Sequence, residues 1–268
     1  MNLEEIRRHW EETGAAFPVG AAVTPTSRDP YLGELERANM LDFLAPTAAA
    51  LEIGCGDAFH SVHYARRVRT LHAVDLAASL AAMAHARVQA EGLANVDVSA
   101  CSVLDIGRRF QGTTFDCVIS QRCLINLPEW KHQQDAILQV HSLLNDGGLF
   151  LLTEGFHENL VRLNEVRTLF QLPPINVVGY NRNLLQGEFE PFMLKHFDVV
   201  EVRHYGMYVL LSRVYHPLVV RPESPAHDSK LNEAAMMLSR AVPAPDLAPY
   251  SYALFYALRK RSAPRPAR

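Results

Sequence analysis

Two acids and two glycines in the N-terminal half of the chain form a pattern that binds nucleotide-like ligands. Glu52 precedes Gly54 and Gly56, which lie one residue apart at the end of the apolar run 48–53. A helical stretch and a second apolar run follow, and that run ends in Asp75. This is the order of a βαβ unit, in which the glycines let a ligand approach the backbone and an acid about 20 residues further on meets ribose hydroxyls. The pattern therefore predicts a nucleotide-like ligand at the carboxyl edge of a parallel sheet.

The third glycine position of the dinucleotide fingerprint narrows the identity of this ligand. The fingerprint Gly-x-Gly-x-x-Gly needs a glycine where this chain has Phe59. A bulky side chain there would prevent close packing of helix on strand, which makes an NAD-dependent oxidoreductase the weaker alternative. The local string resembles motif I of the class I S-adenosylmethionine-dependent methyltransferases, in which a third glycine usually stands at the position of Ala58. The matching string is Leu51-Glu52-Ile53-Gly54-Cys55-Gly56-Asp57-Ala58.

This resemblance extends over residues 48–154 and implies S-adenosylmethionine (SAM) as the cofactor and S-adenosylhomocysteine (SAH) as the product. In related enzymes the segment before the core closes over the cofactor, so that Arg28 and Tyr31 could meet its carboxylate. Ser102 stands where the family usually has an acid, so we expect adenine selectivity to depend more on backbone groups around Val103. The full set of cofactor-binding residues that the resemblance implies is Arg28, Tyr31, Glu52, Gly54, Cys55, Gly56, Asp75, Leu76, Ser102, Val103 and Gln121.

The elements that must position these residues follow from the hydrophobic pattern. Helices are expected over 2–12, 31–44, 77–91, 129–144 and 159–170, and strands over 48–53, 71–74, 95–100, 115–120, 149–153, 197–203 and 252–258. The resemblance implies an α/β, Rossmann-like, mostly parallel seven-stranded sheet of order 3-2-1-4-5-7-6 with an antiparallel last strand. We expect residues 1–45 to form N-terminal helices that cover the cofactor site and residues 46–268 to form the core.

Two stretches, at about 155–196 and 204–250, are much longer than ordinary connections of about 4 to 6 residues. We expect them to form a helical or loop cap that binds the methyl acceptor, because the core already accounts for the cofactor. Arginine suits phosphate or carboxylate groups, while tyrosine and asparagine suit hydroxyls, which favours a sugar, a sugar phosphate or another polar precursor. The alternative is that these side chains are surface or structural groups. The acceptor-binding candidates are Asn126, Asn164, Arg167, Tyr180, Asn181, Arg182 and Tyr208.

A hydroxyl acceptor must lose its proton, which calls for a base within hydrogen-bond reach. Glu154 and His157 follow the strand 149–153, and His204 follows the strand 197–203, so these three are the candidate bases of an O-methyltransferase. A carbon or nitrogen acceptor could need no base. No Asp/Asn cluster indicates a metal ion, and a protein that binds SAM without catalysis is the alternative from a different class.

Composition limits the other classes of protein. The chain has 268 residues, 49% hydrophobic and 21% charged, and a net charge of −3, which disfavours nucleic acid as the partner. Its four cysteines form no Cys-x-x-Cys pair, as expected of a reduced, cytoplasmic protein. We see no apolar run of about 20 residues that would span a membrane. The apolar residues of 209–219 could pack on their own domain or on a second copy, which leaves a homodimer open.

Overall fold

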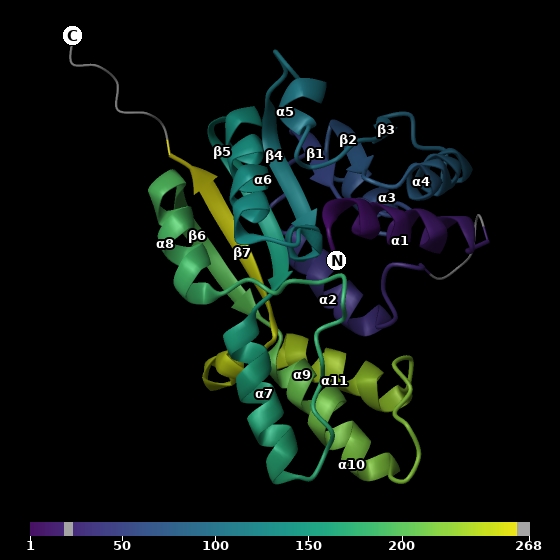
Figure 1. The fold of residues 1–268 in the computed structure, drawn as a ribbon, viewed down its shortest axis with the longest axis vertical. Helices are drawn as coiled ribbons and strands as arrows, with labels where there is room; N and C mark the ends of the chain where they lie inside the picture. Colours follow the sequence, from purple (N-terminus) through teal and green to yellow (C-terminus); the bar gives the residue numbers. More distant parts are fainter. Residues whose placement is uncertain (19–23, 262–268) are drawn as a thin grey trace.

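The computed structural model describes residues 1–18 and 24–261. A seven-stranded sheet runs through the molecule, with helices on both of its faces (Figure 1). Among the described helices, none has both the length and the hydrophobicity needed to cross a bilayer. The strands are β1 (Ala49–Ile53), β2 (Thr70–Asp75), β3 (Val96–Ala100), β4 (Phe115–Gln121), β5 (Leu144–Gly155), β6 (Phe197–His204) and β7 (Ala253–Lys260).

The strand order is β3-β2-β1-β4-β5-β7-β6, which confirms the predicted topology. Strands β1 to β5 pair in parallel, and β7 runs antiparallel to both β5 and β6. The central strands are continuous apolar runs because helices cover both faces of the sheet, and Leu51, Ile53 and Val118 have no exposed surface. The carboxyl ends of β2, β1 and β4 therefore meet at one edge, where the predicted cofactor residues lie.

Helices connect the parallel strands and extend beyond the sheet. The longer ones are α1 (Leu3–Ala15), α2 (Pro30–Leu41), α4 (Ala78–Ala90), α6 (Trp130–Leu143), α7 (His157–Leu169), α8 (Gln186–His196) and α11 (Lys230–Ala241). The short ones are α3 (Ser61–Ala65), α5 (Ile106–Arg109), η1 (Leu124–Asn126), α9 (Gly206–Leu210), η2 (Leu211–Tyr215), α10 (His216–Val220) and η3 (Pro245–Tyr250).

The two insertions fold into different sets of helices. The first contains α7 and α8, and the second folds into α9, η2, α10, α11 and η3. Helices α7, α9, α10 and α11 gather beyond the lower end of the sheet in Figure 1, and we call them, with η2, the helical lobe. Val209 and Val214 are buried in a core that includes Leu163 of α7 and Leu32 of α2. The apolar residues of the second insertion thus pack largely on their own chain.

Candidate functional site

A cavity of about 550 Å³ lies at the carboxyl ends of β1, β2 and β4. This volume is in the range of about 300 to 1,000 Å³ that is usual for small-molecule sites. Its lining includes every predicted cofactor residue except Arg28 and Tyr31. The residues that the sequence placed at four separate strand ends are therefore brought together at one edge of the sheet: Glu52, Gly54, Cys55, Gly56, Asp75, Leu76, Ser102, Val103 and Gln121.

The turn after β1 needs glycine at both motif positions. Gly54 and Gly56 have φ of +69° and +56°, in the left-handed region. A Cβ on Gly54 would lie 2.8 Å from Cβ of Cys123, and one on Gly56 would lie 3.0 Å from Cγ2 of Thr26. Ala58, at the usual third glycine position, adopts φ of +60°. The alanine keeps the turn at a cost of roughly 1–2 kcal/mol in backbone strain.

Asp75 is fixed beside this turn by two backbone groups. Its Oδ2 accepts a hydrogen bond from Gly56 N–H at 2.9 Å, and its Oδ1 accepts one from Ala77 N–H at 2.9 Å. Burial raises the pKa of Asp75 to about 6, and these two hydrogen bonds oppose the rise. Because each carboxylate oxygen can accept a second hydrogen bond, Asp75 keeps acceptor capacity for a diol.

Glu52 supplies a buried oxygen that has no partner. In the described part of the chain, neither Oε2 of Glu52 nor Oγ of Ser61 has a hydrogen-bond partner. Burial raises the pKa of Glu52 to about 8, and the charge of Asp75 adds to this rise. A cationic group such as the ammonium of SAM would lower this pKa again, so that the unpartnered acid at the border of the cavity could bind it as a carboxylate. The glycine turn, Asp75 and Glu52 thus fit the cofactor.

The segment before the core, which was expected to meet the cofactor through Arg28 and Tyr31, lines the cavity with other residues. Thr26 and Ser27 line the cavity, whereas Arg28 is exposed and outside the lining. The hydroxyl of Tyr31 lies 3.4 Å from the backbone carbonyl of Asp228, also away from the cavity. The structure therefore favours the two residues just before Arg28 as the part of this segment that meets the cofactor.

At the far end of the cavity, α2 is tied to the end of β4. Glu36 is buried, and its carboxylate accepts hydrogen bonds from Arg122 Nε at 3.0 Å and from Gln121 Nε2 at 2.9 Å. Gln121 Oε1 accepts from the hydroxyl of Tyr64 at 2.8 Å. Arg122 has φ of +57°, a strained conformation that the surrounding contacts hold in place. Neither Glu36 nor Arg122 was predicted, since their meeting depends on how α2 docks.

An aromatic wall closes the other side. Trp10 of α1 donates from Nε1 to Asn126 Oδ1 at 2.9 Å, and Tyr180 stacks on His9 with ring centroids 4.3 Å apart. Trp10, Asn126, Tyr180 and Asn181 all line the cavity. Oδ1 of Asn181 is buried and has no partner among the described residues. Leu3, Ile6 and Trp10, whose helical spacing predicted the helix over 2–12, are all in the lining.

The other predicted acceptor residues lie outside this cavity and make structural contacts. Asn164 exchanges two hydrogen bonds with the backbone of Ile175, and Arg167 donates to the carbonyl of Pro173 at 2.9 Å. Arg182 Nη1 donates to Gln133 Oε1 at 2.7 Å, and the Tyr208 hydroxyl donates to Asp29 Oδ1 at 2.6 Å. The contacts of these four side chains are those of structural groups, which was the alternative to acceptor binding.

The three candidate bases also lie outside the lining of the cavity. Glu154 is completely buried in β5, which runs two residues past its predicted end, and it binds the turn after β4. His157 is exposed at the start of α7. Nδ1 of His204 accepts a hydrogen bond from Gly206 N–H at 3.2 Å. None of them is placed to take a proton from a molecule in the cavity.

His60 is the histidine that does line the cavity. Burial, with Arg37 and Arg122 nearby, lowers its pKa to about 3, so that the imidazole is neutral. Its Nδ1 lies 3.4 Å from Nη1 of Arg37, and a Cβ on Gly33 would lie 3.4 Å from its Nε2. The ring therefore packs against α2 and is a poor proton acceptor.

The comparisons with known proteins agree with this geometry. Residues 50–148 match the family model for the methyltransferase domain. A comparison with curated proteins finds no significant match. The chain is similar to N-methyltransferase NodS from Bradyrhizobium japonicum WM9 in complex with SAH, at 12% identity over 96% of this chain and 99% of that one, with a TM-score of 0.59.

Two further solved structures share the fold. Magnesium protoporphyrin IX methyltransferase from Synechocystis PCC 6803, with bound SAH, is 13% identical over 97% of this chain and 99% of that one, with a TM-score of 0.59. The [4+2]-cyclase SpnF is 16% identical over 87% and 81%, with a TM-score of 0.54. Identities this low show a common fold, and SpnF shows that the fold also supports other chemistry. Because the methyltransferase-domain model matches residues 50–148, which supply the glycine turn and Asp75, this part of the chain is a methyltransferase domain, and the chain as a whole has the class I methyltransferase fold.

Proposed function

We propose that this enzyme methylates an amino nitrogen of a polar small molecule. The observation that carries the proposal is the placement of the proton acceptors. His157, Glu154 and His204 do not line the cavity, and His60, which does, packs against α2. Of the carboxyl groups in the lining, Asp75 and Glu52 lie at the glycine turn where the cofactor would bind. Glu36 is bound by Arg122 and Gln121, and Glu4 pairs with Arg7. A neutral amine attacks through its lone pair before any proton leaves, whereas a hydroxyl needs a base.

The residues of the cavity would orient the two reactants. When bound, SAM supplies a sulfonium methyl group, so that a carbon–nitrogen bond forms as the carbon–sulfur bond breaks and the product ammonium then loses a proton to water. Asp75 would bind the ribose and Glu52 the ammonium of the cofactor. At the aromatic wall, Oδ1 of Asn181 would accept a hydrogen bond from an N–H of the amine, while the rings of Trp10 and Tyr180 would exclude water.

The remaining lining also supports an amine. Trp10 and Tyr180 are aromatic and would stabilise the positive charge that develops on the nitrogen as it is methylated, and Oδ1 of Asn181 is an acceptor without a partner among the described residues. NodS, one of the structural neighbours, is an N-methyltransferase. A hydroxyl acceptor, such as a sugar or sugar phosphate, was the first expectation from the sequence. The experiment must therefore distinguish methylation of an amine from methylation of a hydroxyl.

The test is a panel of matched acceptors that differ only in an amino or a hydroxyl group, such as amino sugars with sugars and anilines with phenols. SAH formation is measured at saturating SAM. We expect turnover of amines, with a rate that rises with pH up to the pKa of each amine and shifts when that pKa is changed. Turnover of the hydroxyl compounds alone would overturn the proposal, as would a pH midpoint that is the same for every amine.

Variants make this test sharper. His60→Asn should lower the rate with amines less than about tenfold, because a base catalyst typically contributes 10²–10⁴-fold and His60 is not expected to act as one. His63→Asn, in α3 directly after His60 but outside the lining, is the matched control. A loss of about 10²-fold or more in His60→Asn, with SAH affinity retained, would instead favour a hydroxyl acceptor with His60 as its base.

A further inference from the structure

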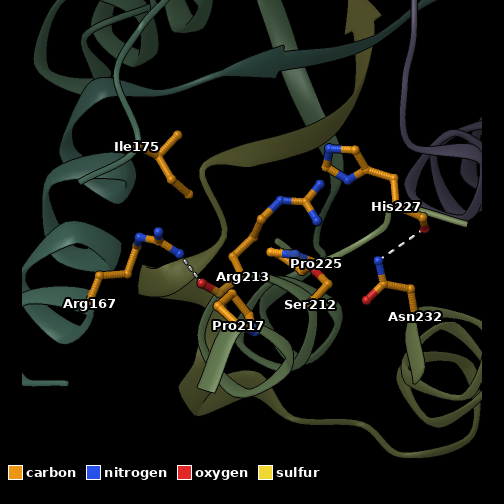
Figure 2. Close-up of a pocket in the computed structure, with 8 residues that line it drawn as sticks. All are labelled: Arg167, Ile175, Ser212, Arg213, Pro217, Pro225, His227 and Asn232. Atoms are coloured by element: carbon orange, nitrogen blue, oxygen red, sulfur yellow. Dashed lines mark hydrogen bonds between the residues drawn. The ribbon is translucent and has the colours of Figure 1, made fainter. Parts of the chain in front are cut away.

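A second cavity, of about 120 Å³, lies in the helical lobe and shares no lining residue with the cofactor cavity. Figure 2 shows it between Arg167 of α7 and Arg213 of η2, with His227 above Arg213 in that view. A buried water needs about 10–15 Å³ of such volume, so the cavity has room for a group of several non-hydrogen atoms. It is much smaller than the cofactor cavity and would take only a small ligand or one end of a larger one.

Arg167 places a buried positive charge in the helical lobe. The residue is 7% exposed, and its guanidinium donates to the carbonyl oxygens of Pro173, at 2.9 Å from Nε, and of Arg213. Among the described residues, no acidic side chain forms an ion pair with it. A buried charge that is met only by neutral dipoles is costly, which makes the lining favourable for an anion.

The neighbouring charges do not cancel this excess. Arg213 pairs with Asp29, whose pKa is held below its usual value because Arg213 and the hydrogen bonds from Leu32 and Tyr208 outweigh the effect of burial. Burial lowers the pKa of His227, so this imidazole adds no charge at neutral pH. Two guanidinium groups thus face one carboxylate, which leaves one positive charge in excess at the cavity.

The remaining walls allow an anion to enter. Pro225 and His227 belong to the exposed loop 221–228, so this side of the cavity is open to solvent. Ile175 and Pro217 supply apolar walls. We propose that the cavity binds a small oxyanion, the carboxylate or phosphate group of a metabolite, on the guanidinium groups of Arg167 and Arg213. Arg167 Nε and Nη2 donate to the carbonyl of Pro173 and Nη1 to that of Arg213, so the oxyanion would accept from the N–H groups that these bonds leave on Nη1 and Nη2 and from those that the ion pair with Asp29 leaves on Arg213.

The test is calorimetry on the full chain with inorganic phosphate and, separately, with acetate, against chloride at constant ionic strength. We expect one anion per chain, with a dissociation constant on the order of 1 mM. The tighter of the two probes distinguishes a phosphate from a carboxylate ligand. Arg167→Gln should weaken binding at least tenfold, whereas Arg162→Gln, an equal charge change at an exposed site of α7, should leave it unchanged.

A second variant covers the case in which Arg167→Gln fails to fold. His227 is exposed at the mouth of the cavity, so His227→Glu should fold and should also weaken binding at least tenfold through charge repulsion. The inference is overturned if neither anion binds at about 20 mM, well above the millimolar range expected, or if both variants bind as tightly as the original chain. SAH affinity, measured on the same samples, reports on the cofactor site independently.

Discussion

The carboxylate of Glu154 accepts a hydrogen bond from the backbone N–H of Leu124 at 2.9 Å. The same oxygen accepts from the Ser120 hydroxyl and from Cys123 N–H, and the other oxygen accepts from Ile125 N–H at 3.2 Å. This buried carboxylate therefore fixes the turn that carries the end of β4 into the cavity. Glu154 acts on the site by holding this turn, without reaching the cavity.

Glu154→Gln should destabilise the fold more than it impairs the chemistry. One oxygen becomes an amide nitrogen that cannot accept, so at least one buried backbone N–H loses its partner. We expect the free energy of unfolding to fall by about 2–4 kcal/mol, with the rate per folded molecule within a few-fold of the original. Urea unfolding and SAH formation measure the two effects, with exposed Glu165→Gln as the control. Unchanged stability with a rate lost by about 10²-fold would make Glu154 a base after all.

His157→Ala and His204→Ala should each keep SAH formation within about twofold of the original enzyme, since a base typically contributes at least about 10²-fold and neither imidazole reaches the cavity. The assay uses the best acceptor of the panel at saturating SAM. If either variant lost most of its activity while its melting temperature stayed constant, the histidine would be close to the reacting atoms, and the amine proposal would lose its main support.

Glu52→Gln should change how stability depends on pH. Burial raises the pKa of Glu52 from 4.5 to about 8, so the folded state holds this proton more tightly than the unfolded state. The stabilisation is complete below about pH 4.5 and is lost as the pH rises to about 8. The variant lacks this loss, so its advantage over the original chain should grow by up to about 1.4 kcal/mol per pH unit across that window.

Urea unfolding of the ligand-free protein at pH 5, 6.5 and 8 checks this expectation. Glu34→Gln is the control, because Glu34 pairs with Arg240 at the surface and should show only a small, flat difference. A gap between Glu52→Gln and the original chain that stayed constant with pH would mean that Glu52 ionises normally in the folded protein.

Trp10 should report ligand binding by its fluorescence. The chain has two tryptophans, and Trp10 lines the cavity whereas Trp130 packs against Phe192 away from it. Addition of SAH should therefore change the emission of Trp130→Phe but not that of Trp10→Phe. The opposite assignment would show that α1 does not cover the ligand.

The cofactor half of the site could be predicted because its residues directly follow strands that the apolar runs mark out. Gly54, Asp75 and Gln121 are each set by a strand end, and parallel strands bring their carboxyl ends to one edge. The order of the strands came from the family resemblance, since a hydrophobic pattern does not order a sheet. Helix α11 was not predicted although its pattern is amphipathic, because the 204–250 stretch was interpreted only as a helical or loop cap, without bounds for its elements.

The acceptor half could not be predicted in the same way. Glu36 reaches the cavity only through the docking of α2 on the sheet, which no local pattern specifies, and the same docking gives His60 and Arg122 their partners. Glu154 was misplaced because β5 continues to Gly155 and pairs with β7, which keeps this carboxyl inside the protein.

Calorimetric titration of the chain with SAH tests the central claim most directly, namely that the cavity beside the glycine turn holds the cofactor through Asp75. We expect one SAH per chain with a dissociation constant on the order of 1–10 μM, and Asp75→Ala should weaken it at least tenfold. Asp97→Ala, at an exposed position of the neighbouring strand β3, should bind as the original does. The absence of binding at about 1 mM SAH, or an unchanged affinity in Asp75→Ala, would contradict the account.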